Sequence, residues 1–369
     1  MHRALATIDL DCVRHNVQTL RQRLLPKCNL MAVVKADGYG HGAEPVARAA
    51  LEAGATTLGV ATIEEAAALR ALGFEAPIVI LGPLTGAEMG RAIDVNAEIL
   101  IWTLPFLKNL VTVAHDLGAA IRCHIKIDTG MRRLGLYPRH LVDFLDMVEP
   151  SPEVVLSGVM THFATADEDD ADFFNFQLHA FEDVVQTVLT TGLTPAFHAA
   201  NSAATLRYRE SHFNMVRCGI AIYGLSPFQG DSAADNLKPA LRLTSYLADV
   251  KEIAEGDSVG YGCSWTAPRR TSIGVIPIGY GDGFSRRLSN RGRVLIGGNS
   301  YPVVGRVSMD QITVDLGPRP AARTGDETVI IGEQGGEAIT AEEIAASLET
   351  INYEVTCNLS GRVERRYKG

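Results

Sequence analysis

The chain has 369 residues, which is longer than one hydrophobic core usually supports, so its length predicts two domains. Its 34 Lys and Arg against 43 Asp and Glu give a net charge of -9, which argues against general affinity for nucleic acid. The six cysteines include no Cys-x-x-Cys pair, which argues against a zinc site or a dense disulfide framework. Apolar stretches are too short to span a bilayer and the first residues lack a signal-peptide core, so we expect a cytoplasmic protein that has no membrane or metal partner.

Short apolar runs alternate with helical patterns through the first two-thirds of the chain. A helix is predicted first, with one apolar face formed by Leu10, Val13, Val17, Leu20 and Leu24. Eight strands are then predicted, at residues 30–35, 57–62, 77–82, 98–103, 121–127, 155–162, 195–200 and 214–220. This alternation favours an α/β fold, a (β/α)8 barrel with its active site at the carboxyl ends of the strands. An open doubly wound sheet is the alternative, although no Gly-x-Gly-x-x-Gly turn supports it.

The sequence pattern changes near residue 238. β-branched runs follow, separated by Gly, Pro, Asn and Asp, at residues 242–254, 271–278, 301–307, 311–316 and 328–332. We therefore expect an N-terminal barrel domain, residues 1–237, and a C-terminal, predominantly β domain, residues 238–369. One helix is predicted over residues 340–348, where Thr340 would cap the first turn and Glu343 would complete a capping box.

The first strand of the predicted barrel delivers Lys35 to a glycine-rich turn at residues 36–42. Apolar surroundings lower the pKa of a lysine, so its amine can attack a carbonyl and form a Schiff base. A lysine that extends from a strand end into water is the commoner occurrence. The motif alone therefore leaves both interpretations open.

The ends of the other strands carry polar groups that together fit one cofactor. They are Lys126 and Arg133 after the fifth strand, His162 after the sixth, His198, Asn201 and Ser202 after the seventh, and Arg217, Gly219 and Ile220 on the eighth. Barrels often bind phosphate on the loops after the last two strands, here at Ser202, Gly219 and Ile220. A Schiff-base lysine opposite a phosphate site fits pyridoxal 5′-phosphate. Each residue alone has an ordinary structural explanation, and it is their joint placement that favours the cofactor.

Ordered motifs cover both predicted domains. They lie at residues 34–42, 126–135, 161–163, 215–224, 259–262, 279–283, 305–311 and 351–355. With these motifs the chain resembles the bacterial alanine racemases, pyridoxal-phosphate enzymes built from a barrel and a β domain. The resemblance implies a homodimer that interconverts L- and D-alanine by a two-base proton transfer and supplies D-alanine for peptidoglycan.

The resemblance also implies two catalytic bases. Lys35 would hold the cofactor as an internal aldimine, and Tyr261 would reach the site of the partner subunit. Two bases suit racemisation, because a proton leaves one face of the Cα and another arrives on the opposite face. A phenol with a pKa near ~10 needs donor groups that favour its anion, and the network of His162, Arg217 and His198 would supply them. By the same resemblance Arg217 would face the cofactor's ring nitrogen and leave it largely unprotonated.

The remaining implied roles concern binding. The phosphate would be held by Tyr39, Ser202, Gly219, Ile220 and Tyr353, and the cofactor would also contact His162, Asn201 and Arg217. Arg133 and, across the dimer, the backbone of Met309 would engage the substrate carboxylate. His198 would lie behind Arg217, and Asp310 would support the shared site. Lys126 matches a lysine that is carbamylated in many relatives and braces Arg133, and a plain salt-bridged lysine is equally consistent with the sequence. The chain departs from the usual residues only outside reacting roles, at Arg132, Ser264 and Glu364.

Three other functions remain open. One added hydroxyl or methylene changes specificity by only ~1–3 kcal/mol, so the sequence also permits a serine or broader amino-acid racemase. A barrel decarboxylase of basic amino acids shares the architecture, but the near-continuous motif agreement argues against it. A non-catalytic pyridoxal-phosphate carrier needs only the barrel and its lysine, and the β domain with Tyr261 and Met309 argues against it.

Overall fold

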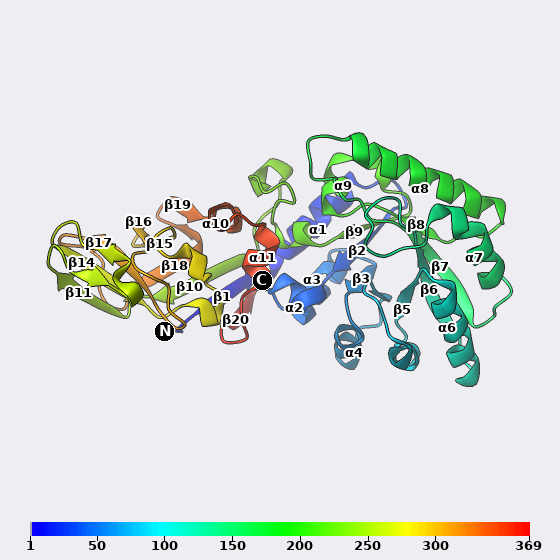
Figure 1. Ribbon diagram of the computed structural model, residues 1–369, viewed down its shortest axis with the longest axis horizontal. Coiled ribbons are helices and arrows are strands. Elements are labelled where there is room, and N and C mark those ends of the chain that lie inside the picture. The colour runs from blue at the N-terminus through cyan, green and yellow to red at the C-terminus, as the bar shows by residue number, and fades with distance from the viewer. Residues whose placement is uncertain (1) are drawn as a thin grey trace. The chain divides into compact units, whose positions relative to one another are not determined.

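The structure is a computed structural model that describes residues 2–369, and the chain forms two compact units (Figure 1). The barrel unit comprises Arg14–Gly38 and Ala43–Ile222. The β unit comprises the segment that ends at Val13, the turn Tyr39–Gly42 and Tyr223–Gly369. The N-terminal segment and the turn after Gly38 therefore belong, by their contacts, to the β unit.

The described barrel unit contains one sheet of eight parallel strands, in the spatial order β8-β7-β6-β5-β4-β3-β2-β9. They are β2 (Asn29–Val33), β3 (Thr57–Val60), β4 (Ile78–Ile80), β5 (Glu98–Ile101), β6 (Ile121–Lys126), β7 (Val154–Met160), β8 (Ala196–His198) and β9 (Met215–Cys218). Backbone hydrogen bonds close the ring between β8 and β9, from Asn214 N to Phe197 O (3.0 Å) and from Arg217 N to Ala200 O (2.9 Å). The predicted strands and barrel are confirmed, and the open-sheet alternative is wrong.

Helices follow the strands and lie outside the ring (Figure 1). They are α3 (Ala43–Glu52), α4 (Ile63–Ala71), α5 (Met89–Asp94), α6 (Leu104–Asp116), α7 (Leu141–Val148), α8 (Asp172–Thr190) and α9 (Ser202–Arg207). The predicted first helix is α1 (Leu10–Arg23), in which Val13, Val17 and Leu20 are fully buried. The interior of the ring is packed with apolar side chains, chiefly Met31, Val79, Leu100, Met160 and Met215. The barrel is therefore a filled core, and its loops are left to build a site.

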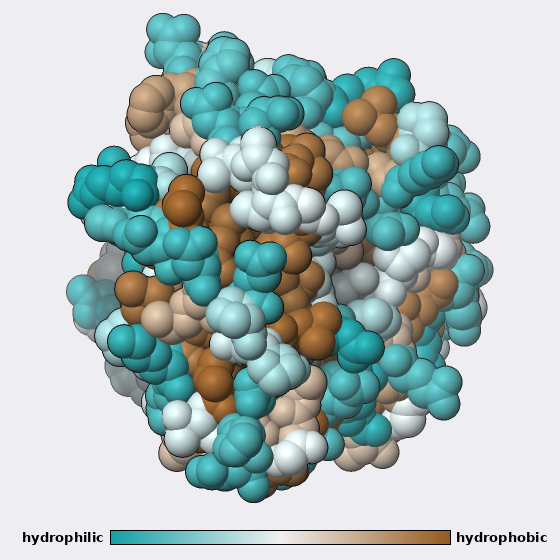
Figure 2. Space-filling model, turned by 90° about the vertical axis from the view of Figure 1, so that its right-hand side faces the viewer, coloured by the Kyte–Doolittle hydropathy of each residue, from teal (hydrophilic) through white to brown (hydrophobic). Residues whose placement is uncertain are grey.

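Figure 2 faces the outer side of the barrel unit and shows apolar residues interspersed among hydrophilic ones. Large exposed apolar side chains of this unit include Val142 of α7, Val155 of β7 and Phe176 of α8. Scattered exposed apolar side chains are ordinary on protein surfaces, so we assign no site to them.

The β unit contains a larger sheet, a smaller sheet and a hairpin, and their strands pair antiparallel except for β1 with β20. The larger runs β16-β15-β18-β10-β1-β20, with β19 on β18; the smaller is β11-β14-β17, and β12 pairs with β13. Their bounds are β1 (Leu5–Asp9), β10 (Leu241–Tyr246), β11 (Asp249–Ile253), β12 (Ser258–Val259), β13 (Trp265–Thr266), β14 (Thr271–Ile276), β15 (Arg293–Ile296), β16 (Asn299–Pro302), β17 (Ile312–Gly317), β18 (Glu327–Gln334), β19 (Glu337–Ile339) and β20 (Glu364–Lys368). The predicted mostly β character is confirmed. Strand β1, between β10 and β20, was not predicted.

Two details of the β unit differ from expectation. The strand predicted over residues 301–307 ends at Pro302, and Gly305 has the left-handed φ of 77°, which interrupts an extended chain. The predicted helix is α10 (Ala341–Leu348), and the hydroxyl of Thr340 accepts from Glu343 N at 3.1 Å. The capping box is only half formed, because the carboxylate of Glu343 instead accepts from the guanidinium of Arg293 (2.6 and 2.7 Å). A second helix follows, α11 (Asn352–Cys357).

Within residues 2–369, no helix combines the length and apolar character that crossing a membrane requires. In the same described part of the chain, no three or more His, Cys, Asp or Glu side chains are grouped so as to hold a metal ion.

Candidate active site

Lys35 begins α2 (Lys35–Tyr39), a left-handed turn directly after β2. Ala36, Asp37 and Gly38 have φ and ψ near 50–61° and 44–51°, a conformation that costs non-glycine residues roughly 1–2 kcal/mol each. The turn closes with a hydrogen bond from Gly38 N to Val34 O at 2.9 Å. Such strain persists only where the surroundings hold it, and it is typical of functional sites.

Two carboxylates hold this turn. The two oxygens of Glu65 accept from Ala36 N and Ala61 N, each at 2.7 Å, and Asp37 accepts from Ala43 N at 2.9 Å. The backbone at Lys35 is therefore tied to α4 and to the start of α3. Glu65 was not among the residues predicted from the sequence. Its position three residues after the α4 N-cap, Thr62, suggests a capping residue, but its carboxylate bonds to the loops after β2 and β3 instead.

Cations gather at the carboxyl ends of the barrel strands. Burial first, then Arg133 and Arg217, lower the pKa of Lys126 to about 8; Lys35 adds to the effect and Asp128 opposes it. Burial and the same cations, led by Arg217, lower the pKa of His162 well below its usual value. The structure thus brings together five predicted site residues, and four of them, Lys35, Lys126, Arg133 and Arg217, are basic. A cluster of basic groups of this kind suits a ligand that carries anionic groups.

Arg217 on β9 is buried, and burial lowers the pKa of its guanidinium to about 9. Its Nη1 donates to the carbonyl of His198 (2.8 Å), and its Nη2 donates to the carbonyls of Thr161 (2.8 Å) and Ala199 (2.9 Å). Nη2 also donates to Nδ1 of His162 at 3.0 Å. Because His162 is neutral and accepts at Nδ1, we assign its single proton to Nε2.

The loops after β8 and β9 meet at Ser202, which begins α9. Its hydroxyl accepts from Gly219 N (3.1 Å) and Ala221 N (3.4 Å). Asn201 is the N-cap of α9, and its side chain accepts from Ala204 N at 3.0 Å. A 3₁₀ turn, Ile220–Tyr223, begins at the same place. Helical N-termini leave backbone N–H groups for anions, so this junction, beside the cation cluster, fits the phosphate of pyridoxal phosphate.

Tyr39 and Tyr353 come together in the β unit, with ring centroids 6.0 Å apart. Burial first, and then Tyr353, raise the pKa of Tyr39 well above its usual value, so its hydroxyl stays protonated and can donate. Gly40 beside it has φ 82°, and a Cβ there would lie 2.1 Å from the carbonyl of Thr356 on α11. Close packing on α11 thus fixes the turn that carries Tyr39.

Tyr261 and Met309 lie on the surface of the β unit, 71% and 51% exposed. Tyr261 starts a 3₁₀ turn, Tyr261–Cys263, between β12 and β13. The carbonyl of Met309 accepts from Gly281 N at 2.9 Å, and Asp310 accepts from Arg362 at 2.6 Å. These predicted residues are therefore held on ordered turns with accessible side chains.

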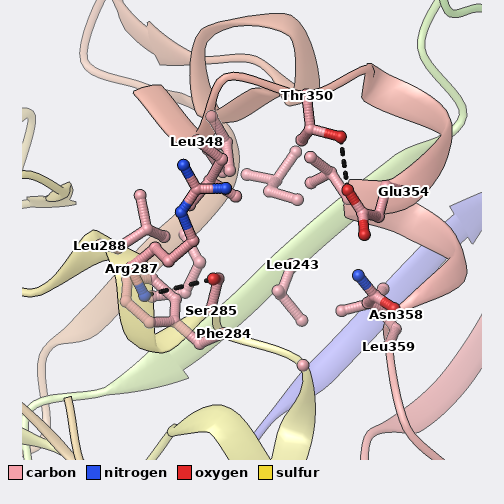
Figure 3. A pocket seen from close by; sticks show the side chains of 15 residues that line it. Leu243, Phe284, Ser285, Arg287, Leu288, Leu348, Thr350, Glu354, Asn358 and Leu359 are labelled. Atoms are coloured by element: carbon pink, nitrogen blue, oxygen red, sulfur yellow. Dashed lines mark hydrogen bonds between the residues drawn. The ribbon is translucent and has the colours of Figure 1, made fainter. Parts of the chain in front are cut away.

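A cavity of about 110 Å³ lies in the β unit (Figure 3). Its wall is mostly apolar, with Leu243, Phe284, Leu288, Leu348 and Leu359 around it. At one edge the hydroxyl of Thr350 donates to the carboxylate of Glu354. The described residues that line it include none of the predicted site residues, so we assign it no part in the candidate site.

Comparison with known proteins covers both units. The chain matches family models described as "Alanine racemase, N-terminal domain" over residues 8–227 and "Alanine racemase, C-terminal domain" over residues 240–367. The alanine racemase of Symbiobacterium thermophilum is 43% identical over 365 residues, which cover 99% of this chain and 97% of the relative.

Solved structures agree with the sequence matches. The alanine racemase from D-cycloserine-producing Streptomyces lavendulae superposes with a TM-score of 0.96 at 40% identity, covering 100% of this chain and 98% of the other. The alanine racemase of Bacillus anthracis with bound L-Ala-P has a TM-score of 0.93 at 37% identity, covering 100% and 96%. The likeness therefore extends over sequence, both domains and fold.

Proposed function

The chain belongs to the alanine racemase family, whose members depend on pyridoxal 5′-phosphate, and we propose how its residues interconvert L- and D-alanine. The observation that carries the proposal is the cation cluster that includes Lys35 at the carboxyl ends of the barrel strands. A cofactor phosphate and a substrate carboxylate would balance the charge of that cluster. Family membership and this chemistry point to the same reaction.

We assign the cofactor to residues by their chemistry. Lys35 would hold it covalently, and Ser202, Gly219 and Ile220 would bind its phosphate, with Asn201 fixing the start of α9. His162 and Arg217 would lie along its ring. Tyr39 and Tyr353 are proposed phosphate ligands on the family resemblance alone. When bound, pyridoxal phosphate withdraws electrons from the amino acid and acidifies the Cα proton.

The chain's own groups then move the proton. Lys35 would take it from one face of the Cα, and Tyr261 of a second subunit would deliver one to the other face. Arg133 and the backbone of Met309 would orient the substrate carboxylate. His162, with its proton on Nε2, can donate a hydrogen bond that favours a phenolate.

A homodimer with shared sites is part of this proposal. The exposure of Tyr261 and Met309 on ordered turns supports it, because both side chains are available to a partner. We also propose functional domains at residues 1–237 and 238–369, a cytoplasmic location and a supply of D-alanine for peptidoglycan. The free state of all six cysteines supports a reducing compartment.

Racemisation of L-alanine by purified holoenzyme tests the proposal, with solvent deuterium followed at the Cα. Lys35→Ala should nearly abolish turnover, and Tyr261→Phe should impair it severely while the cofactor colour remains. The matched controls are Lys251→Ala and Tyr246→Phe, which change residues outside the proposed site. Unchanged turnover in Tyr261→Phe would remove that residue from its role. A panel with serine and basic amino acids would detect a broader racemase or a decarboxylase.

A further inference from the structure

We infer that Glu98 is a positioning residue for the active site: through His124 and His198 it sets the direction of a hydrogen-bond chain that ends on Arg217. The inference rests on the proposed role of Arg217 at the cofactor ring. Glu98 and His124 lie deeper in the barrel than the cation cluster and belong to none of the motifs that the sequence analysis singled out.

Strand register brings the four side chains into the barrel interior. Glu98 starts β5, His124 lies in the middle of β6, His198 ends β8 and Arg217 lies on β9. Residues paired across parallel strands face the same side. All four have partners in the apolar interior cluster, in the pairs Val79–Glu98, Leu100–His124, Met160–His198 and Met31–Arg217. The hydrogen-bond chain formed by these four side chains therefore runs through the core, from the amino ends of the strands toward their carboxyl ends.

Continuous contacts link the four groups. Oε2 of Glu98 lies 2.6 Å from Nε2 of His124, and Nδ1 of His124 lies 2.9 Å from Nε2 of His198. Nδ1 of His198 lies 3.3 Å from Nη1 of Arg217. His124, His198 and Arg217 are each at most 4% exposed, so water does not compete for these bonds.

Only one arrangement of protons satisfies every contact. Arg217 has no acceptor, so Nδ1 of His198 must carry a lone pair. Burial lowers the pKa of His198 well below its usual value, so its single proton is on Nε2 and is donated to Nδ1 of His124. His124 then carries its proton on Nε2, where the carboxylate of Glu98 accepts it.

The backbone of β7 makes room for this arrangement. A Cβ at Gly158 would lie 2.0 Å from Nδ1 of His124, the atom that accepts from His198. An alanine at this position would push the imidazole out of the chain. Residue 158 must therefore be a glycine for the imidazole of His124 to keep this position.

A carboxylate at residue 98 matters because an ionised carboxylate only accepts hydrogen bonds, whereas a carboxamide both donates and accepts. In Glu98→Gln the amide can donate to His124, and the chain can then run in reverse. Reversal places an N–H of His198 against an N–H of Arg217, which displaces the guanidinium. In Glu98→Leu no acceptor remains, and the favoured direction is lost.

The test is the ¹⁵N NMR spectrum of holoenzyme labelled in histidine, which reports which ring nitrogen carries the proton. We expect His124 and His198 to be protonated on Nε2 in the wild-type enzyme, and Nδ1-protonated His198 to appear in Glu98→Gln and Glu98→Leu. We also expect kcat for alanine to fall about 10- to 100-fold, the range known for hydrogen-bond partners of metal-ligating histidines, with KM changed less than about threefold. Glu153→Gln is the matched control, because Glu153 bonds to the exposed His115 at 3.0 Å.

Either of two results would overturn the inference. One is an Nδ1-protonated His198 or His124 in the wild-type holoenzyme. The other is that both Glu98→Gln and Glu98→Leu keep the wild-type histidine tautomers and the wild-type kcat. If neither variant folds, the wild-type tautomers alone decide. Wild-type racemisation of alanine is measured separately, so failure of the proposed function is distinguishable from failure of the hydrogen-bond chain.

Discussion

Asp282 offers a direct test of how the β unit holds the loop that carries Met309. Its fully buried carboxylate accepts from both terminal nitrogens of Arg3 (2.6 and 2.8 Å) and from Gly279 N (2.9 Å). Arg3 also donates to the carbonyl of Asp310 at 3.1 Å. The carboxylate thus joins the N-terminal segment, the turn at residues 279–282 and the loop at residues 308–310.

Asp282→Asn keeps the shape of the side chain but removes its charge and turns one acceptor into a donor that faces Arg3. Loss of one partner from a buried ion pair costs about 3–5 kcal/mol. The side chain of Arg3 is 34% exposed, so water solvates its unpaired charge and offsets part of that cost. We therefore expect the free energy of unfolding to fall by about 2–4 kcal/mol. For a unit of this size the midpoint of thermal unfolding should fall by about 4–16 °C. The KM for alanine should rise, because the loop that is released carries Met309, the proposed partner of the substrate carboxylate.

Urea and thermal unfolding of holoenzyme, followed by circular dichroism, measure the effect. Glu337→Gln is the control, since Glu337 pairs with Arg293 on the exposed surface of the same unit. A loss below about 1 kcal/mol, equal to that of the control, would show that the buried pair contributes no more than a surface pair. It would refute the reasoning.

Four further predictions concern three other positions. With a pKa of about 8, the amine of Lys126 is ~25% neutral at pH 7.5, against ~0.1% for an ordinary lysine, so holoenzyme in ¹³C-bicarbonate should show a carbamate resonance that Lys126→Met lacks. Between that pKa and 10.5 the unfolded state binds more protons at Lys126 than the folded state, so the free energy of unfolding of the wild-type protein should increase as pH rises over this range. Denaturation at several pH values measures this. A difference in the free energy of unfolding between wild type and Lys126→Met that does not change with pH would contradict it. Gly224→Ala, at φ 79° with a Cβ 1.8 Å from the carbonyl of Lys238, should lower the free energy of unfolding by about 2 kcal/mol or more; wild-type urea stability would exclude the clash. Thr340→Ala should cost about 1 kcal/mol by removing the α10 cap, and no change in the urea midpoint would mean the cap is replaced.

The barrel strands could be predicted because a parallel strand is buried on both faces and therefore appears as a continuous apolar run. β2, for example, is buried at four of its five residues. Strand β1 could not be predicted in the same way. It alternates buried and half-buried residues over Leu5–Asp9, and it is stabilised by pairing with β20 at the other end of the chain.

The candidate site shows the same contrast. Lys35 and the residues after each strand could be named because barrels place their sites at strand ends. The roles of Glu65 and of the left-handed turn at Ala36 could not, because they depend on which loop lies beside which. Whether Tyr261 acts in a second subunit stays a prediction.

The amino-acid sequence by itself determined most of the secondary structure, the two kinds of domain and the family, because hydrophobic periodicity and short motifs are local properties. Only the tertiary structure decided which polar groups meet inside the barrel. Glu98, His124, His198 and Arg217 are distant in the chain, and each looks ordinary in its own segment. They form one hydrogen-bond chain because strand register points all four inward, and because a buried polar atom must find its partner among the side chains that the register supplies.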